Sequence, residues 1–338
     1  MKTLLVGIVG TDNFGDEAMF KVAYKSLKEQ GKDILVLTYN VHKASQRFSE
    51  IEFIQMPSFS KSSYLTSLFG RDQFKIDVSN FDALYVAGGG NLNSNYTSHV
   101  LNMYLLTKKF KNLKKYVEFR PQSIGPFYGK SRFLIEYLVK NIVKYSDRFY
   151  VRELLSLEYL KSKGIETHLQ RDDAWNLEID SSIQLPSNNY VGICIRPWKE
   201  MNLLTNYVQE LTKILIRMNF SPLFIPIAYG GNKKYIDNVF LKGKVEGVFL
   251  DDLVDVYSLT PEKIKGIISK CIFTIGMSYH FNVFSLSSGV PSGALYMDEY
   301  YKIKNLGLYK AFGNPDLVFK VPDTPVDVLV QKILSITR

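Results

Sequence analysis

The sequence predicts an α/β protein with two Rossmann-like, doubly wound domains that face a cleft. Short apolar runs alternate with longer helical stretches, which is typical of βαβ units and a parallel sheet. The alternation restarts near residue 190, after a polar stretch at 180–189 that contains Pro186. The length of 338 residues also suits two domains of roughly 150–180 residues each better than one core.

The first half alternates strands and helices in a regular order. We expect strands at 4–9, 33–37, 83–87, 115–120 and 148–151, because these runs are short and apolar. We expect helices between and after them at 16–30, 97–109, 131–145 and 153–163. These elements form a predicted N-terminal domain over 1–182.

The second half repeats this order. The expected strands are 190–195, 221–227, 248–250, 271–275 and 292–296, and the expected helices are 205–218, 260–269, 280–288 and 327–337. The predicted C-terminal domain covers 190–325, with the stretch 180–189 as the linker. The final segment, 326–338, could cross back and pack on the first domain.

The charge balance is basic but does not indicate a nucleic-acid-binding protein. Lys and Arg outnumber Asp and Glu by 42 to 33, which gives a net charge of +9. Neither a zinc-finger spacing nor an aromatic RNA-binding signature is present. A lysine-rich run at 108–115 is interpreted as a solvated helix face, with contact to a membrane surface or a polyphosphate as the alternative.

The cysteines and the N-terminus favour a cytoplasmic protein. Cys194 and Cys271 lie in separate apolar runs without a CxxC motif, which predicts buried thiols and no metal site. The apolar N-terminal run is followed by acidic residues where a signal peptide would have its cleavage site. No stretch approaches the length of a membrane span. We therefore expect any membrane contact to be peripheral, at the inner face.

Candidate binding residues follow the predicted strands, because ligands of doubly wound sheets bind beyond the carboxyl ends of the strands. The first strand leads into GTDNFGDEAMF (10–20), where Asp16 and Glu17 either complement the helix dipole or contact sugar hydroxyls. The glycines of AGGGNLN (87–93) predict a tight loop before Asn91. The segment RPQSIGPF (120–127) predicts a stiff polar loop that carries Gln122.

Further polar residues follow later strands. Arg152 is placed to form a fork for a carboxylate or phosphate, or else a surface ion pair with Glu153 or Asp147. Asp172 lies in RDDAW (171–175), and Arg196 ends the strand of GICIRPW (192–198). Tyr229, in the turn PIAYGG (226–231), is a candidate for stacking on a sugar ring.

His280 is the candidate for proton transfer. It lies in IGMSYHFNVFSLSSGVP (275–291), where a strand is expected to pass into a helix. A histidine suits proton delivery near neutral pH. The alternative is that its ring only packs among the neighbouring aromatic residues at the helix start. Ser278 is expected to cap this helix, whose N-terminus would then favour an anion.

Taken together, these motifs resemble the polysaccharide pyruvyl transferase family. The shared segments, in the family's order, are NFGDEA, GGGNL, QSIGPF, VRE with Ser156, DDAW, IRPW, LTPEKIKGIISKC, and the glycine-Met-x-x-His segment that runs into SLSSGVPSGALYMDEYYKIKNLGL. They span about residues 4–310. Each motif is weak alone, whereas eight in order are a specific signal.

The resemblance implies a glycosyltransferase-B-like fold and a reaction. The reaction is transfer of a pyruvyl group from phosphoenolpyruvate, as co-substrate, to two hydroxyls of a sugar, which forms a ketal. The acceptor would be a cell-surface polysaccharide or its precursor, free or lipid-linked. The family pattern maps the donor-contacting residues onto Arg152, His280 and Lys302, with Lys304 as second choice. His280 is the implied catalytic residue. Neither a metal nor a further cofactor is implied.

One departure from the family pattern keeps alternatives open. Ser278 occupies the position where family members usually carry an arginine, so a donor-binding cation is missing. Arg196, Lys302 or Arg120 could replace that charge. Two other functions remain: a glycosyltransferase that uses a nucleotide sugar, and a degenerate member that binds glycans without catalysis. The first domain is expected to be the acceptor side and the second the donor side.

Overall fold

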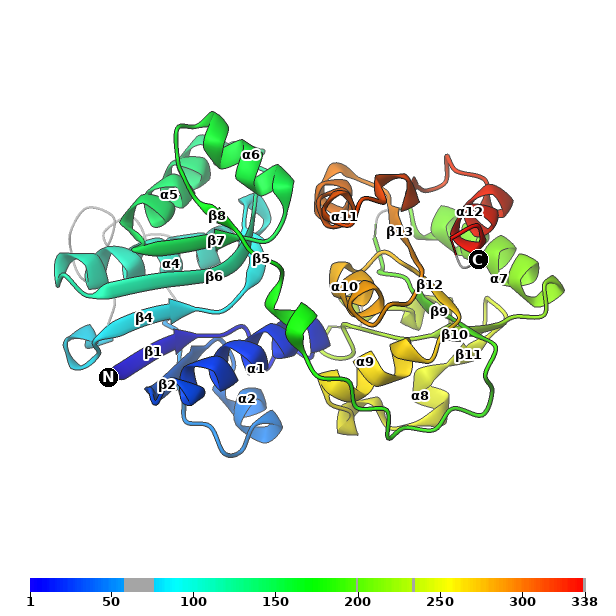
Figure 1. The fold of residues 1–338 in the computed structure, drawn as a ribbon, viewed down its shortest axis with the longest axis horizontal. Coiled ribbons are helices and arrows are strands. Elements are labelled where there is room, and N and C mark those ends of the chain that lie inside the picture. Colours follow the sequence, from blue (N-terminus) through cyan, green and yellow to red (C-terminus); the bar gives the residue numbers. More distant parts are fainter. Residues whose placement is uncertain (58–75, 199, 233–234, 337–338) are drawn as a thin grey trace. The chain divides into compact units, whose positions relative to one another are not determined.

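The computed structural model confirms the predicted α/β fold with two Rossmann-like domains (Figure 1). It describes residues 1–57, 76–198, 200–232 and 235–336. The chain divides into two compact units. Unit 1 comprises residues 1–11 and 19–173, and unit 2 comprises residues 12–18 and 174–338.

Unit 1 is built on a parallel sheet with strand order β3-β2-β1-β4-β6-β7-β8. The strands are β1 (Lys2–Val6), β2 (Asp33–Thr38), β3 (Phe53–Gln55), β4 (Ala83–Val86), β5 (Gly89–Leu92), β6 (Tyr116–Ile124), β7 (Arg148–Val151) and β8 (His168–Leu169). β5 lies off this path and pairs with β6. The strand order reverses between β1 and β4, which is the switch point where doubly wound sheets bind ligands.

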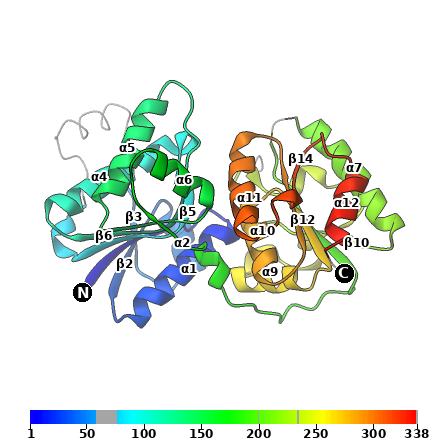
Figure 2. The same ribbon diagram turned by 45° about the horizontal axis from the view of Figure 1, so that its top comes forward.

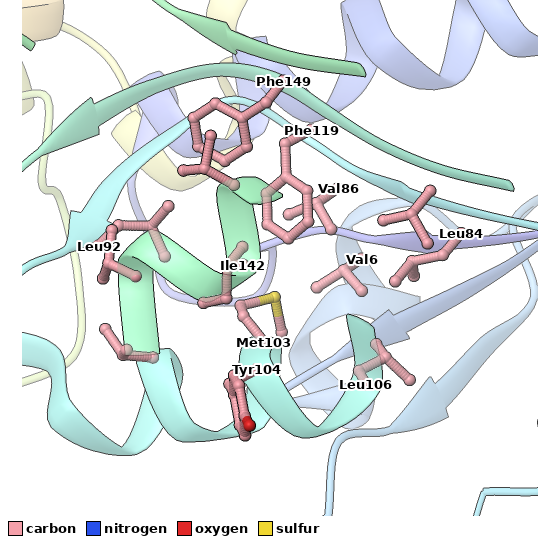
Figure 3. Packing of buried hydrophobic residues seen from close by; sticks show 14 of the residues in the cluster. Val6, Leu84, Val86, Leu92, Met103, Tyr104, Leu106, Phe119, Ile142 and Phe149 are labelled. Carbon is pink, nitrogen blue, oxygen red and sulfur yellow. The ribbon is translucent and has the colours of Figure 1, made fainter. Parts of the chain in front are cut away.

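Helices cover both faces of this sheet (Figure 2). They are α1 (Phe14–Glu29), α2 (Val41–Arg47), α4 (Thr97–Asn112), α5 (Arg132–Tyr145) and α6 (Leu154–Ser162). Alternate residues of β1 point to opposite faces: Leu4 and Val6 pack with α4 and α5, whereas Leu5 packs with α1 and α2. Figure 3 shows residues of the first of these cores, including Met103 of α4 and the stacked rings of Phe119 and Phe149.

Unit 2 repeats the design with strand order β11-β10-β9-β12-β13-β14, again parallel throughout. The strands are β9 (Tyr190–Cys194), β10 (Ser221–Phe224), β11 (Val248–Phe249), β12 (Phe273–Gly276), β13 (Ser292–Tyr296) and β14 (Val318–Lys320). The helices are α7 (Met201–Arg217), α8 (Leu250–Leu253), α9 (Pro261–Ser269), α10 (Tyr279–Ser287), α11 (Glu299–Ala311) and α12 (Val326–Leu334). The switch point of this sheet lies between β9 and β12.

The C-terminal helix differs from its expected position. α12 packs against α7 and β13 within unit 2, on the face opposite to α9, α10 and α11 (Figure 1). Its buried residues Leu329 and Ile333 explain this placement, because the Cδ1 atom of Ile333 lies close over Gly293 in β13. The helix therefore completes the core of its own unit, instead of crossing to the first domain.

The boundary between the units also differs from the predicted one. It falls between Asp173 and Ala174, not at 182. Two lysines of unit 2 explain the shift. The Lys265 Nζ donates to the carbonyls of Trp175 (2.9 Å) and Leu177 (2.7 Å), and Lys270 holds two carbonyls of the expected linker, at 181 and 183. The stretch that reads as a linker is thus fixed to the surface of unit 2.

Two expected loops in unit 1 are strands. Gly89–Leu92 forms β5, and β6 continues through 120–124, so neither GGGNL nor RPQSI is a free loop. The register of β6 against β7 shifts between Phe119 and Gln122. Pro121 lies at this shift because it has no N–H to donate to the ladder. Glycine-rich and proline-containing segments have low strand propensity, so here pairing to neighbouring strands overrides it.

The lysine-rich run is a solvated face only in part: Lys111 and Lys114 are exposed, but other lysines of the run bind the chain. The Lys115 Nζ donates to the carbonyls of Val78 (2.8 Å), Ser79 (2.5 Å) and Phe81. Lys109 bonds the Ile76 carbonyl at 3.0 Å, and Lys111 pairs with Asp147 at 2.8 Å. These ammonium groups hold the segment before β4 and the turn before β7 to α4, which gives most of the run a structural role.

Candidate functional site

The switch point of unit 2 brings together three residues singled out in the sequence. Arg196 follows β9, and Ser278 and His280 follow β12, the strand next to it. Because the two strands are parallel, their carboxyl ends meet at one edge of the sheet. This edge is where α10 begins, so its N-terminal N–H groups point toward the same place.

His280 is packed against the backbone of Gly15, which belongs to the same unit. A Cβ atom at Gly15 would lie 2.1 Å from the His280 Nδ1 and 2.2 Å from its Cγ. Only glycine allows this approach. The ring of Tyr279 stands edge-on to the imidazole, with centroids 5.3 Å apart. The glycine of the NFGDEA motif and the candidate catalytic histidine are therefore parts of one site.

The segment 12–18 is held to unit 2 by main-chain bonds. The Phe14 N–H donates to the Ile227 carbonyl (3.0 Å), and the Tyr229 N–H donates to the Asp12 carbonyl (2.9 Å). The Asn13 Oδ1 accepts the N–H groups of Gly15 (2.9 Å) and Asp16 (3.3 Å) and so caps α1. This cap fixes the Gly15 backbone where it meets the imidazole.

Glu17 and Tyr229 form a buried pair beside this contact. The Tyr229 hydroxyl donates to the Glu17 Oε1 at 2.5 Å, and the Tyr229 ring stacks on Phe14 with centroids 4.1 Å apart. One face of the tyrosine is therefore covered by protein, which restricts the sugar stacking expected from the sequence. Asp16 is partly exposed, one position before the buried Glu17 in the first turn of α1.

Arg196 is held by a buried carboxylate that the sequence did not reveal. Its Nε donates to the Asp237 Oδ1 at 2.8 Å and its Nη2 to the Asp237 Oδ2 at 3.1 Å, a bidentate ion pair. The same carboxylate accepts the N–H groups of Ile227 (3.1 Å) and Ala228 (2.8 Å). Asp237 therefore ties the arginine to the turn that carries Tyr229.

A polar network lies behind the start of α10. Asn305 in α11 donates to the carbonyls of Met277 (3.4 Å) and Leu295 (3.2 Å), and the Asn282 amide donates to the Gly276 carbonyl and the Asn305 Oδ1, both at 3.2 Å. Both asparagines are buried. They fix the backbone that turns from β12 into the helix of His280, and no periodic pattern in the sequence indicates this role.

Ser278 occupies the N-cap position of α10, as expected, but its side chain makes no capping hydrogen bond. Ser278 contributes to the helix through its backbone instead: its carbonyl accepts the first helical hydrogen bond, from the Asn282 N–H, at 3.2 Å. Ser278 is nearly buried. A serine at this point leaves a small side chain, without charge, at the switch point.

The two lysines of α11 differ in their surroundings. Lys302, the first choice for donor contact, is half-exposed and pairs with Glu299 at 2.8 Å. Lys304, the second choice, is buried, with its Nζ 4.1 Å from the centre of the Tyr300 ring. The start of α11 is bound to the segment that follows β9, because the Trp198 Nε1 donates to Asp298, the N-cap residue, at 2.8 Å.

A cavity of about 330 Å³ opens beyond the ends of β10 and β11. Tyr229, Tyr257 and Asp255 line it together with Asn238. Asn238 adopts a left-handed backbone conformation (φ 66°), and its Oδ1 accepts the Ile195 N–H at 2.7 Å. Its buried Nδ2 has no hydrogen-bond partner among the residues that the structure describes. The cavity thus combines aromatic rings with carboxylates.

In unit 1, Arg152 is buried at the carboxyl end of β7. Its Nη1 donates to Asp172 at 2.7 Å, its Nε donates to the Ser123 hydroxyl at 2.7 Å, and Glu153 lies 3.7 Å away. The surface ion pair considered for Arg152 is therefore a buried network, and its main partner is Asp172. Two of the predicted site residues are thus brought together as a charge pair.

A second buried arginine of unit 1 is also paired with an aspartate. Arg120 binds Asp173 through two hydrogen bonds, at 2.6 and 2.7 Å. Burial raises the pKa of the Asp173 carboxyl, and the Arg120 guanidinium opposes that rise. Gln122 is buried and donates to the Ala87 and Arg120 carbonyls, whereas Asn91 lies partly buried in β5. Each aspartate of the DDAW motif therefore holds one arginine.

Four of the five candidate cations contact a carboxylate: Arg120, Arg152, Arg196 and Lys302 contact Asp173, Asp172, Asp237 and Glu299. The fifth, Lys304, contacts Tyr300. An anionic ligand would have to bind the remaining donor atoms or compete with these partners. The roles of the predicted site residues stay predictions. The residues missed from sequence are Gly15 as the contact of His280, Asp237, Asn238, Asn282 and Asn305.

Solved structures share this architecture at low sequence identity. MnaA of S. aureus, solved with UDP, superposes with a TM-score of 0.61 at 11% identity, covering 99% of this chain and 87% of that chain. UDP-GlcNAc 2-epimerase from Methanocaldococcus jannaschii gives 0.58 at 12%, with coverages of 100% and 92%. Anabaena Alr3699/HepE, in complex with UDP, gives 0.59 at 12%, with coverages of 99% and 89%. These likenesses confirm the glycosyltransferase-B-like fold.

Sequence comparison identifies the family. A comparison with curated proteins gives no match. The family model for polysaccharide pyruvyl transferase, however, matches residues 13–299, which begin at Asn13, the cap of α1, and extend to the start of α11. Most of the chain is covered, including the switch-point residues of unit 2 and the Arg152 network of unit 1. The chain therefore belongs to the polysaccharide pyruvyl transferase family.

Proposed function

We propose that this chain transfers a pyruvyl group from phosphoenolpyruvate to two hydroxyls of a sugar in a cell-surface polysaccharide or its precursor. Membership of the family supports transfer of this general kind. The observation that carries the proposal is the contact between His280 and Gly15. It joins two motifs from opposite ends of the family pattern at the switch point of a doubly wound sheet.

The proposed chemistry begins at the methylene carbon of phosphoenolpyruvate. A proton adds to this carbon, and the neighbouring carbon becomes cationic. One acceptor hydroxyl attacks that carbon and loses its proton. The bond between this carbon and the phosphate oxygen then breaks, and phosphate leaves with the bonding electrons. The second hydroxyl attacks the same carbon and loses its proton, which closes the ketal. The products are the pyruvylated sugar and inorganic phosphate, without a further cofactor. His280 is proposed to exchange the proton, because an imidazole does so readily near neutral pH.

Donor recognition is proposed to use Arg196, Ser278 and Lys302 in unit 2, and Arg152 in unit 1. The start of α10 supports this, because the first N–H groups of a helix have no partner within the helix and favour a carboxylate or phosphate. Asp237 binds Arg196 through Nε and Nη2. The third nitrogen, Nη1, is the atom that we propose contacts the donor, while the ion pair keeps the guanidinium in place.

Acceptor recognition is proposed to use the predicted residues Asp16, Glu17, Asn91, Gln122, Asp172 and Tyr229. The cavity beside Tyr229 adds support in unit 2, because aromatic faces and carboxylates together suit a neutral polyhydroxylated ring. These contacts do not distinguish one sugar from another.

The test compares two donors. Purified protein is incubated with phosphoenolpyruvate or with UDP-sugars and a set of polysaccharide and lipid-linked acceptors. We expect inorganic phosphate release and a new ketal carbon signal in NMR with phosphoenolpyruvate only. His280→Ala should abolish this turnover, whereas His42→Ala, a control at an α2 residue outside the site, should retain it. Release of nucleoside diphosphate would instead support a glycosyltransferase.

A further inference from the structure

The first turns of α5 expose apolar side chains that a soluble helix would bury. Phe133 is 69% exposed, Tyr137 58% and Leu134 44%, and Tyr128 in the preceding loop is 48% exposed. Phe133 and Tyr137 are four residues apart and Leu134 and Tyr137 three, so the three side chains share one face of the helix. We call Tyr128, Phe133, Leu134 and Tyr137 the α5 patch.

The opposite face of α5 is also apolar. Ile135, Leu138, Val139, Ile142 and Val143 are buried in the core of unit 1. A helix that lies on a soluble domain normally carries polar residues on its outer face. Here the beginning of α5 is apolar on both faces. Core packing accounts for one face only, and an exposed apolar patch of this kind is typical of an interaction site.

Basic residues surround the α5 patch. Lys130 and Arg132 are exposed, and the Arg132 guanidinium lies 4.3 Å from the centre of the Phe133 ring. Between residues 128 and 144 there are four basic residues and one acidic residue, Glu136. That single carboxylate pairs with Lys140 (3.0 Å) and Lys163 (3.4 Å). The charge at the rim of the patch is therefore positive.

Exposed aromatic and aliphatic side chains rimmed by cations are what an anionic lipid surface recognises. Tyrosine and phenylalanine insert at the boundary between headgroups and acyl chains, while lysine and arginine interact with lipid phosphates. No helix in the described part of the chain is long and apolar enough to cross a membrane. Contact through the patch would be confined to one leaflet.

We propose that the α5 patch docks unit 1 on an anionic membrane surface. The lysine run at 108–115, the alternative considered from sequence, is a weaker candidate, because Lys109, Lys111 and Lys115 are engaged with carbonyls and a carboxylate. Charge complementarity favours a membrane over a second copy of the chain, because two copies meeting through this patch would bring their positive rims together.

Vesicle flotation tests the proposal on the full chain. Vesicles of phosphatidylcholine with about a third phosphatidylglycerol are compared with vesicles of phosphatidylcholine alone. We expect the wild type to float with the anionic vesicles and at least tenfold less with the neutral ones. Raising the salt from about 0.1 M to 1 M should weaken binding, because the Debye length falls from about 10 Å to 3 Å.

The variant F133S/L134S/Y137S should lose flotation, and K130Q/R132Q should weaken it. The matched control is I216S/V328S, which removes exposed apolar residues from α7 and α12 and should float like the wild type. Phe133→Glu alone serves as a second patch variant if the triple variant does not fold.

Three results would overturn the proposal. The wild type could fail to float with anionic vesicles, or the folded patch variants could float as well as the wild type. The third result would be a wild-type dimer in sedimentation experiments, monomeric patch variants, and no vesicle binding by either. It would identify a second copy of the chain as the partner of the patch. None of these measurements depends on the donor or acceptor of the transfer reaction.

Discussion

Replacing Gly15 by alanine is the sharpest perturbation of the proposed site. The new Cβ would lie 2.1 Å from the His280 Nδ1 and 2.6 Å from the His280 Cβ. Ordinary contacts between such atoms are about 3.5 Å, so the imidazole or the 12–18 segment would have to move by about 1.4 Å. The whole base of the side chain is involved, and a small rotation of the ring cannot relieve the overlap.

The expected effect of Gly15→Ala is larger on activity than on folding. A displacement of about 1 Å in a reacting group can cost about 100-fold in rate. Overpacking of this kind costs about 1–3 kcal/mol of stability. Activity would be measured as phosphate release from phosphoenolpyruvate in the presence of acceptor, and stability by urea denaturation.

Two further variants make this reasoning refutable. Gly31→Ala is the control, because no atom lies within 4 Å of a Cβ at that position; its positive φ adds local strain away from the site, so activity should be retained. In a His280→Gly background, the added methyl group at Gly15 meets no imidazole, and its effect on stability should shrink. Wild-type activity in Gly15→Ala would refute the proposed role of the contact.

Three other predictions follow from the buried polar groups. Asp237→Asn should lower stability by about 3 kcal/mol and reduce turnover, because it breaks the ion pair with Arg196; unchanged chemical denaturation would contradict this. Asn305→Leu leaves the Met277 carbonyl without its donor and should cost about 1–3 kcal/mol, measured by thermal unfolding. Burial lowers the pKa of Lys265 from 10.5 to about 8. In the folded state this lysine therefore loses its proton earlier than in the unfolded state. Stability relative to Lys265→Met should rise between about pH 8 and 10.5, and a constant difference across this range would contradict the prediction.

The alternation of short apolar and amphipathic segments was sufficient to predict the two sheets. The limits of β7 and β13 match the predicted strands: polar residues flank the apolar run of β7, and β13 begins directly after Pro291. The limits of β5 do not, because its glycines gain strand structure only from pairing with β6. The hydrophobic pattern of a segment therefore predicts its secondary structure well only where that structure depends on the segment's own composition.

The site was predictable only in part, because its contacts join segments far apart in the chain. His280, Arg196 and Ser278 lie at neighbouring strand ends, as the strand-end argument expects. By contrast, the placement of 12–18 in unit 2 depends on main-chain bonds to 227–229, about two hundred residues away. Asp237 lies outside any strand end or motif, and only its bonds to Arg196 reveal it.

The position of the domain boundary shows the same limit. A polar, proline-containing stretch is typical of a linker. Lys265 and Lys270, however, reach out of α9 and its C-terminus to hold the carbonyls of that stretch. Lysines that bond main-chain carbonyls have no signature in sequence, and the same kind of contact gives Lys109 and Lys115 their structural role.

The most direct test of the proposed donor is calorimetric titration of the full chain with phosphoenolpyruvate and, separately, with UDP-GlcNAc. We predict that phosphoenolpyruvate binds, that His280→Ala weakens this binding by about tenfold, equivalent to about 1.4 kcal/mol, and that UDP-GlcNAc gives no heat. Binding of UDP-GlcNAc without binding of phosphoenolpyruvate would contradict the assignment of this site to pyruvyl transfer.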